Sequence, residues 1–164
     1  MEATLVTRRL RLLPLQVSHA EEMAVVLSDP ALHTFIGGTP ATVEALRARY
    51  TRMIAGSPAW CNWVIELDGH LVGTVQATIG PDDAEIAWVV GTPWQGQGIA
   101  KEAAMALVAW LRGQGAGVIT AHIHPDHHAS AAVAVAVGLT PTDVTHDGEI
   151  LWRFVSSREP GEAP

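Results

Sequence analysis

The chain has 164 residues, of which 48% are hydrophobic and 16% are charged, and its formal net charge at pH 7 is -7. This length and composition predict a single globular domain, placed at residues 1–156, and exclude a disordered chain. The acidic balance also argues against a general nucleic-acid binder, because neutralising phosphates requires a basic surface.

Several absences narrow the class further. Cys61 is the single cysteine, so the sequence offers no disulfide framework and no all-cysteine metal site. The first residues lack a basic segment followed by an apolar one, and no apolar run reaches the ~18 residues of a membrane span. We therefore expect a cytoplasmic protein, monomeric or homodimeric, that binds neither membranes nor nucleic acid. The tail at 157–164 is expected to be flexible.

The first third of the chain predicts one strand and two helices. Residues 4–15 mix basic and apolar side chains and predict the first strand. Ser18 is placed to cap a helix over 19–27. Thr42 is placed to cap a second helix, which has apolar residues at helical spacing and Gly56 after its end.

The remaining segments predict strands around one glycine-rich loop and its helix. The Asp-Gly dipeptides at 68–69 and 147–148 are typical of hairpin turns. Residues 129–137 fit either a strand or a helix, because Ala and Val alternate while the Ala content and Gly138 favour a helix. The result is an α/β domain with a largely antiparallel sheet. The other predicted elements are strands at 62–67, 71–79, 84–90, 118–123, 139–144 and 149–155 and a helix at 99–112.

The loop before the helix at 99–112 has the composition of a diphosphate site. Glycines let the backbone approach an anion closely and point successive N–H groups at it. The helix N-terminus adds unpaired donors and the positive end of the helix dipole. Lys101 is the only lysine in the chain. It falls in the first helical turn, where a cation is disfavoured by roughly 0.3–1 kcal/mol unless an anion binds nearby.

The spacing of the loop distinguishes between diphosphate motifs. The dinucleotide fingerprint requires a third Gly or Ala where this chain has Lys101, and a P-loop requires Gly-Lys-Ser/Thr after four spacer residues, so neither motif is present. The pattern Gln/Arg-x-x-Gly-x-Gly/Ala is met by Gln95, Gly98 and Ala100. This pattern resembles the coenzyme A pyrophosphate loop of the GNAT acetyltransferases.

The resemblance to this family extends over nearly the whole chain. Residues 7–12 (Thr-Arg-Arg-Leu-Arg-Leu) resemble the first strand of the branch that contains ribosomal-protein N-terminal acetyltransferases, and residues 71–74 (Leu-Val-Gly-Thr) resemble the family's third strand. The resemblance implies a mixed, mostly antiparallel sheet of six to seven strands, about four helices, and a splayed central strand pair that binds the pantetheine arm. Matching positions downstream are held by His127, Ser130, Val133, Ala134, Gly138 and Leu139.

The resemblance also implies the reaction. We expect an acyl-coenzyme A-dependent N-acyltransferase, with acetyl-CoA as the default donor, in which a primary amine attacks the thioester directly. The acceptor is a small-molecule amine or a peptide or protein N-terminus, and no metal is expected. Two alternatives stay open. A phosphopantetheinyl carrier protein could replace coenzyme A as the donor, or the chain could be a non-catalytic sensor that binds acyl-CoA.

Roles for individual residues follow from their positions in the family's motifs. Glu85 is the expected general base, acting through water, and Ser130 and His127 are expected near the thiol. Many relatives have a tyrosine where this chain has Ala134, and His127 replaces the usual asparagine. The source of the proton for the leaving thiolate therefore stays open. Ser130, His127 or a water could donate it, or the thiolate could leave unprotonated. The residues expected to contact the coenzyme are Trp88, Val89, Val90, Gln95, Gly96, Gln97, Gly98, Ile99, Ala100, Lys101, His127 and Ser130.

The histidines at 122–128 offer a rival interpretation. Their pattern, His-x-His-x-Asp-His, is the zinc motif of the metallo-β-lactamase fold, and imidazoles two residues apart on an extended chain face the same side. That fold places further His and Asp ligands well downstream in a longer chain, whereas here His146 is the only histidine after residue 128. The sequence therefore favours histidines of a strand end and a turn over a zinc centre.

Overall fold

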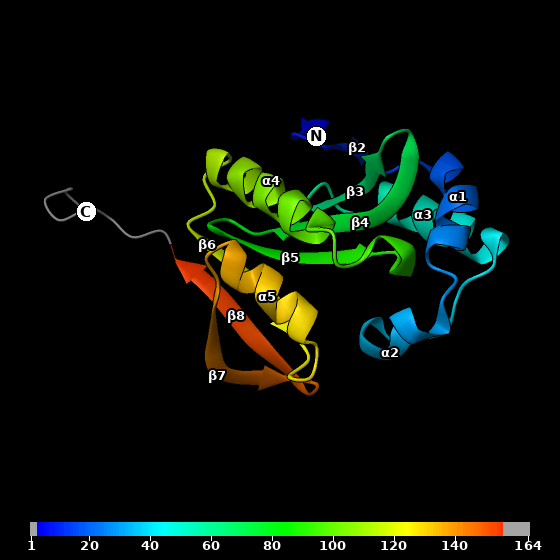
Figure 1. Cartoon of the computed structure of the whole chain (residues 1–164). Helices are drawn as coiled ribbons and strands as arrows, with labels where there is room; N and C mark the ends of the chain where they lie inside the picture. The colour runs from blue at the N-terminus through cyan, green and yellow to red at the C-terminus, as the bar shows by residue number, and fades with distance from the viewer. Residues whose placement is uncertain (1–2, 156–164) are drawn as a thin grey trace, which may run out of the picture.

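The computed structural model describes residues 3–155, and the eight strands in this range form one sheet with the order β1-β2-β3-β4-β5-β6-β8-β7 (Figure 1). Neighbouring strands are antiparallel except β5 and β6, which are parallel. The predicted tail at 157–164 lies outside the described residues. The strands are β1 (Leu5–Val6), β2 (Leu10–Pro14), β3 (Trp60–Leu67), β4 (His70–Ile79), β5 (Asp83–Val90), β6 (Val118–Ile123), β7 (Thr140–His146) and β8 (Glu149–Val155).

The described strands outnumber the six to seven predicted because the expected first strand at 4–15 is in fact two strands. β1 and β2 pair antiparallel, with Leu5 opposite Leu12. The turn between them is closed by a hydrogen bond of 2.9 Å from Thr7 N to Leu10 O. The other predicted strands are confirmed, with ends that differ from the prediction by a few residues at most.

Five α-helices occur within residues 3–155, where about four are predicted. The short helix α2 is additional. Thr42 caps α3 as predicted, since its Oγ1 accepts a hydrogen bond of 3.1 Å from Ala45 N. Ser18 does not cap α1: it lies inside a 3-10 turn whose capping box is formed by Gln16 and His19. The helices are α1 (Ala20–Val26), α2 (His33–Ile36), α3 (Val43–Ala55), α4 (Ile99–Gly113) and α5 (His128–Ala136).

Helix α5 covers the segment that the sequence leaves open between strand and helix. It ends in a Schellman motif, in which Gly138 has a φ of +92°. Gly138 N donates to Val135 O at 3.1 Å, and Leu139 N donates to Ala134 O at 2.9 Å. The Ala content and the glycine stop therefore outweigh the alternation of Ala and Val.

Helices cover both faces of the sheet (Figure 1). Helices α4 and α5 lie on one face, and α1 and α3 lie on the other. Trp63 and Ile65 of β3 belong to the core under α4, whereas Val64 belongs to the core under α1 and α3. This alternation is what a strand buried on both faces requires, and each such side chain contributes roughly 1.5–3 kcal/mol to stability.

The parallel strands β5 and β6 separate along their length. They pair at three positions only, from Asp83 opposite Val118 to Glu85 opposite Thr120. Beyond these positions β5 pairs with β4 and β6 pairs with β8, and the two strands diverge (Figure 1). The predicted splayed central pair is thus confirmed. Within the described chain, the β5 edge that faces β6 has no strand partner from 86 to 90.

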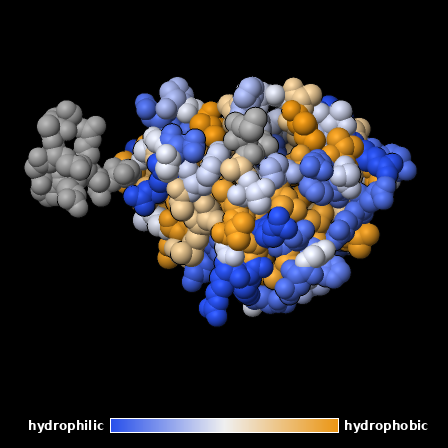
Figure 2. Space-filling model, turned by 90° about the horizontal axis from the view of Figure 1, so that it is seen from above, coloured by the Kyte–Doolittle hydropathy of each residue, from blue (hydrophilic) through white to orange (hydrophobic). Residues whose placement is uncertain are grey.

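No helix within residues 3–155 is both long enough and apolar enough to cross a membrane. On the face shown in Figure 2, hydrophobic residues form patches that hydrophilic residues interrupt.

Candidate active site

The loop between β5 and α4 presents a row of unpaired backbone donors. Its start is fixed to β4 by a hydrogen bond of 2.8 Å from Gly91 N to Val72 O. Gly96 and Gly98 have φ of +78° and +76°, a conformation that costs a residue with a Cβ about 1–2 kcal/mol. Among the described residues, none of the N–H groups at 96–101 donates a hydrogen bond to a protein group. These donors are therefore available to an anion at the N-terminus of α4.

Glu102 anchors the N-terminal turn of α4 to the start of the chain. Its carboxylate accepts hydrogen bonds from Thr7 Oγ1, from Arg9 N at 2.9 Å and from Arg9 Nε at 2.7 Å. Partial burial works to raise the pKa of Glu102, but these hydrogen bonds and the charge of Arg9 hold it below its ordinary value. Thr7 and Arg9, which belong to the segment that resembles the family's first strand, thus hold α4 in place. The N-terminus of α4 directly follows the loop.

A cavity of about 670 Å³, here called the loop cavity, opens beside this loop. Of the residues expected to contact the coenzyme, Gln97 alone does not line it; its Nε2 lies 3.5 Å from Pro93 O. Gln95 lines the cavity, but its Nε2 donates to Val90 O at 3.0 Å and ties the loop to β5. The expected residues that line the cavity are Trp88, Val89, Val90, Gln95, Gly96, Gly98, Ile99, Ala100, Lys101, His127 and Ser130.

Gly73 on β4 sets the position of β5 along this cavity. Gly73 pairs with Val90, and a Cβ on Gly73 would lie 2.2 Å from Val89 O. Because any side chain would displace that carbonyl, only glycine allows the two strands to approach in this way. This contact is a physical reason for the glycine in the motif at 71–74.

The N-terminal end of α5 brings His127 and Ser130 together. Ser130 Oγ lies 3.4 Å from His127 Nε2, and the His127 ring stacks on Phe35 of α2 with a centroid distance of 4.3 Å and an interplanar angle of 5°. Burial first, and the neighbouring His124 second, lower the pKa of His127 below its ordinary value. The lowered pKa favours the neutral imidazole, in which one ring nitrogen can accept a hydrogen bond.

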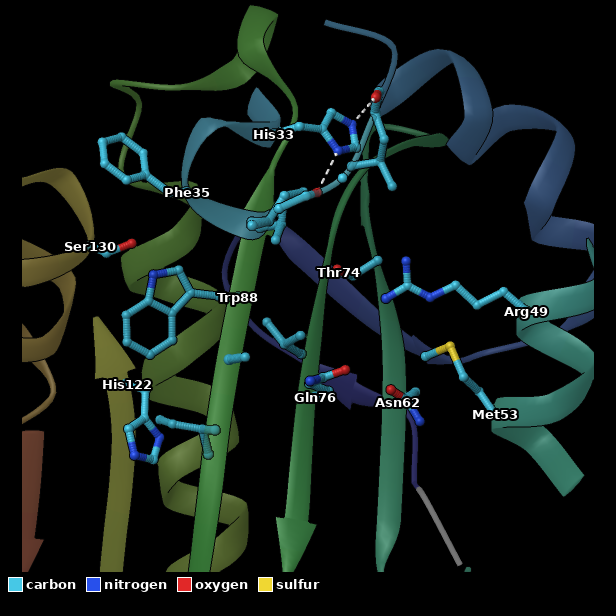
Figure 3. A pocket seen from close by; sticks show the side chains of 18 of the residues that line it. His33, Phe35, Arg49, Met53, Asn62, Thr74, Gln76, Trp88, His122 and Ser130 are labelled. Carbon is cyan, nitrogen blue, oxygen red and sulfur yellow. Dashed lines mark hydrogen bonds between the residues drawn. The ribbon is translucent and has the colours of Figure 1, made fainter. Parts of the chain in front are cut away.

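A second cavity, of about 520 Å³, lies on the face of the sheet that α3 covers, and we call it the sheet cavity (Figure 3). Asn62 of β3 and Gln76 of β4 stand opposite each other on this face, and Thr74 lies beside them (Figure 3). Arg49 extends over the same strands from α3 (Figure 3). The sheet cavity is thus lined by polar side chains from β3, β4 and α3.

Sequence reasoning misses these polar residues. The available signal was the presence of Asn62 and Gln76 at alternate positions inside otherwise apolar strands, because a buried amide needs partners that an apolar core does not offer. Asn62 is indeed buried, with 5% of its surface exposed. Arg49 gives no such signal, since an arginine on an amphipathic helix is ordinarily exposed.

The two cavities meet at β5. Trp88, Val89, Phe35, His127 and Ser130 line both of them. In Figure 3 the Trp88 indole points from β5 toward the side on which Ser130 lies. A group bound in the loop cavity would therefore lie next to a group bound in the sheet cavity.

The predicted base Glu85 lines the sheet cavity and has a partner that sequence reasoning misses. His122 Nδ1 lies 2.6 Å from Glu85 Oε1. The Glu85 side chain is 51% exposed and that of His122 is 28% exposed, so solvent reaches the carboxylate. Because Glu85 pairs with Thr120 across the parallel strands, the next side chain on the same face of β6 is His122. The pairing of Glu85 with His122 could therefore be predicted only once the register of β5 and β6 was known.

Tyr50, the only tyrosine of the chain, lines the sheet cavity but does not offer its hydroxyl. Within residues 3–155 its Oη is buried and has no hydrogen-bond partner. Burial raises the pKa of Tyr50 to about 12, against the opposing effect of the positive charge of Arg49. This tyrosine does not supply the acid that the sequence leaves unassigned, because its oxygen is inaccessible.

The histidines of the rival zinc motif point to separate partners. His122 bonds Glu85, His124 Nδ1 accepts from Asp126 N at 3.1 Å, and His127 stacks on Phe35. Across residues 3–155 no three His, Cys, Asp or Glu side chains converge as metal ligands would. The geometry is that of a strand end followed by a turn.

Comparisons with known proteins agree with this geometry. Residues 9–140 match the family model described as Acetyltransferase (GNAT) domain. A search of curated proteins by sequence gives no match. The chain belongs to the GNAT acetyltransferase family, because the matched segment covers most of its length.

Solved structures show the same fold at low sequence identity. A GNAT-family acetyltransferase from Bacillus anthracis has a TM-score of 0.80 and 20% identity, with 94% of this chain and 99% of that chain covered. RimL, a ribosomal-protein alpha-N-acetyltransferase in complex with coenzyme A, has a TM-score of 0.81 and 20% identity, with coverage of 94% and 98%. The microcin self-immunity acetyltransferase MccE, in complex with acetyl-CoA and AMP, has a TM-score of 0.73 and 16% identity, with coverage of 91% and 93%.

Proposed function

We propose that the protein transfers an acyl group, acetyl by default, from acyl-coenzyme A to a primary amine by direct attack within a ternary complex. The observation that carries this proposal is the meeting of two cavities at Trp88, Val89 and Ser130. One cavity fits the donor and the other fits the acceptor, so the reacting groups meet without a covalent enzyme intermediate.

The loop cavity fits the donor. When bound, acyl-coenzyme A supplies an activated acyl group as a thioester. The unpaired N–H groups at 96–101 and the N-terminus of α4 bind the diphosphate. Lys101, which lines the cavity, adds a positive charge. The open edge of β5 from Trp88 to Val90 pairs with the amide-bearing arm as an added strand does.

Glu85 accepts a proton from the acceptor, and Ser130 stabilises the sulfur of the leaving group. Glu85, with His122 bound to its Oε1, accepts the proton that an ammonium acceptor must lose before its nitrogen attacks. An N–H group on the open edge of β5 binds the thioester oxygen as negative charge develops there. Ser130 Oγ donates a hydrogen bond to the sulfur as the C–S bond breaks, and neutral His127 supports Ser130 from 3.4 Å.

A thiol-release assay tests the proposal. Purified protein is incubated with acetyl-CoA and a panel of amines and peptide N-termini, and free thiol and acetylated product are both measured. RimL is named for a protein N-terminus as its acceptor, which supports including peptides. We expect turnover with at least one amine. Tight coenzyme binding without turnover on any acceptor would favour the acyl-CoA sensor instead. An acyl carrier protein added as the donor in a parallel series tests the carrier alternative.

A further inference from the structure

The sheet cavity contains a cation that no protein group neutralises. Arg49 lines the cavity, and in Figure 3 its guanidinium extends from α3 toward Thr74. Within residues 3–155, Arg49 forms neither an ion pair nor a hydrogen bond, whereas Arg47 on the same helix is bound to Glu21. An arginine that extends over a polar cavity without a carboxylate partner is suited to an anionic group from a ligand.

The sheet register places this cation close to the proposed reaction centre. Thr74 pairs with Val89 of β5, and adjacent strands are about 4.8 Å apart. Val89 lines both cavities and lies where the thioester is expected. Arg49 therefore lies on the β4 side of the reaction centre, and the Glu85–His122 pair lies on its β6 side.

The charges of the sheet cavity thus differ from one side to the other. Glu85 and Glu149 line it with His122 on the β6 side. On the opposite side Arg49 is the cation, and the strand side chains there are the neutral Asn62, Thr74 and Gln76. An ammonium group is favoured on the first side and an anion on the second. A neutral amine would leave the guanidinium without a partner in the complex.

We propose that the acceptor is an amine that also carries an anionic group, by default a carboxylate, a few bonds from its nitrogen. Arg49 binds this anion, and the nitrogen then lies between Val89 and Glu85. The inference rests on the proposed acyltransferase function and names its substrate class. A free amino acid and a short peptide with an acidic residue near its N-terminus share this chemistry, and a cavity of about 520 Å³ admits either.

Matched pairs of acceptors test this inference. Each pair holds the same amine with a carboxylate or with the corresponding carboxamide: β-alanine against β-alaninamide for free amino acids, and glycyl-aspartate amide against glycyl-asparagine amide for peptides. We measure kcat/KM for acetyl transfer at several pH values, so that differences in amine pKa are separated from recognition. We expect at least a roughly 10-fold preference for the carboxylate member in one pair, since a charge-assisted bidentate contact is lost in the other member.

Two variants of α3 identify the residue responsible. Arg49→Gln is expected to abolish the preference and to leave the affinity for coenzyme A unchanged. Arg52→Gln serves as the matched control, because Arg52 is an exposed arginine of the same helix that does not line the cavity. The control is expected to keep the wild-type preference.

The outcomes separate the two proposals. Turnover without any preference in either pair, or a preference that survives Arg49→Gln, would overturn the inference while leaving the acyltransferase function intact. Failure of every acceptor, charged or neutral, despite bound coenzyme A would overturn the proposed function and this inference with it. The pair that shows the preference identifies whether the anion belongs to a free amino acid or to a peptide.

Discussion

The loop cavity and the sheet cavity share β5 but are built from different parts of the polypeptide. Backbone N–H groups at 96–101 and the open edge of β5 dominate the first. Side chains dominate the second, with Arg49 from α3 and Glu85 and His122 from neighbouring parallel strands. A backbone site depends on glycines and local spacing, whereas a side-chain site can be altered one residue at a time. For this reason the donor is easier to assign from the sequence than the acceptor.

The largest expected effect is a loss of catalytic rate when a side chain of the sheet cavity is changed. Glu85→Gln should lower kcat on the order of 10²-fold or more, as expected when a general base is lost, while the Kd for coenzyme A stays unchanged. Steady-state rates across pH together with calorimetric binding measure both quantities. Asp143→Asn, on the exposed strand β7, is the control and should match wild type. An unchanged rate for Glu85→Gln across the pH range would remove Glu85 from the mechanism.

In the loop cavity, one added methyl group should weaken the binding of coenzyme A. Gly98→Ala places a Cβ on a residue with φ of +76°, and we expect the Kd for coenzyme A to rise on the order of 10-fold, or 1.4 kcal/mol. Gly115→Ala is matched, because Gly115 has φ of +95° but lies after α4. Both variants should lose about 1–2 kcal/mol of stability. Isothermal calorimetry should find weaker binding for Gly98→Ala only, and equal affinities would contradict a backbone-built site.

A smaller effect, on stability, tests whether side chains hold the N-terminus of α4 in place beside the loop cavity. Glu102→Gln should reduce the free energy of unfolding by about 1 kcal/mol, because hydrogen bonds from Thr7 and Arg9 to a charged acceptor are weakened. The folded-state pKa of Glu102 is lowered, so its contribution is present above the unfolded-state pKa and is lost as pH falls through the folded-state pKa. The stability difference in urea titrations should therefore shrink on acidification. A difference that stays constant down to low pH would contradict this role for the charge.

The smallest effect concerns the hydroxyl of Tyr50, which is buried away from the sheet cavity that the residue lines. Tyr50→Phe removes a buried hydroxyl without a partner in the described chain, so we expect the free energy of unfolding to rise by up to about 1 kcal/mol. Thermal and urea unfolding measure this change, and kcat and KM should not move. A loss of activity would show that the sheet cavity uses Tyr50 after all, in a conformation that exposes its oxygen.

Features that depend on local sequence were predictable. The Asp-Gly turn at 68–69 forms with positive φ at both residues, and Thr42 caps α3. The spacing of Gln95, Gly98 and Ala100 indicated the loop before its structure was known. Ser18 was assigned wrongly because Gln16 and His19 form a competing capping box one turn earlier, a choice that depends on side-chain geometry and not on residue type.

The sequence by itself determined the family, most of the order of the elements and the loop proposed for the donor, because each depends on residues close together in the chain. Tertiary structure alone decided how the sheet cavity, which is proposed to hold the acceptor, is built. Glu85 and His122 are 37 residues apart and meet only through the register of two parallel strands. Arg49 reaches the same cavity from α3, on its opposite side. Such contacts arise from how strands and helices pack, and no local pattern encodes them.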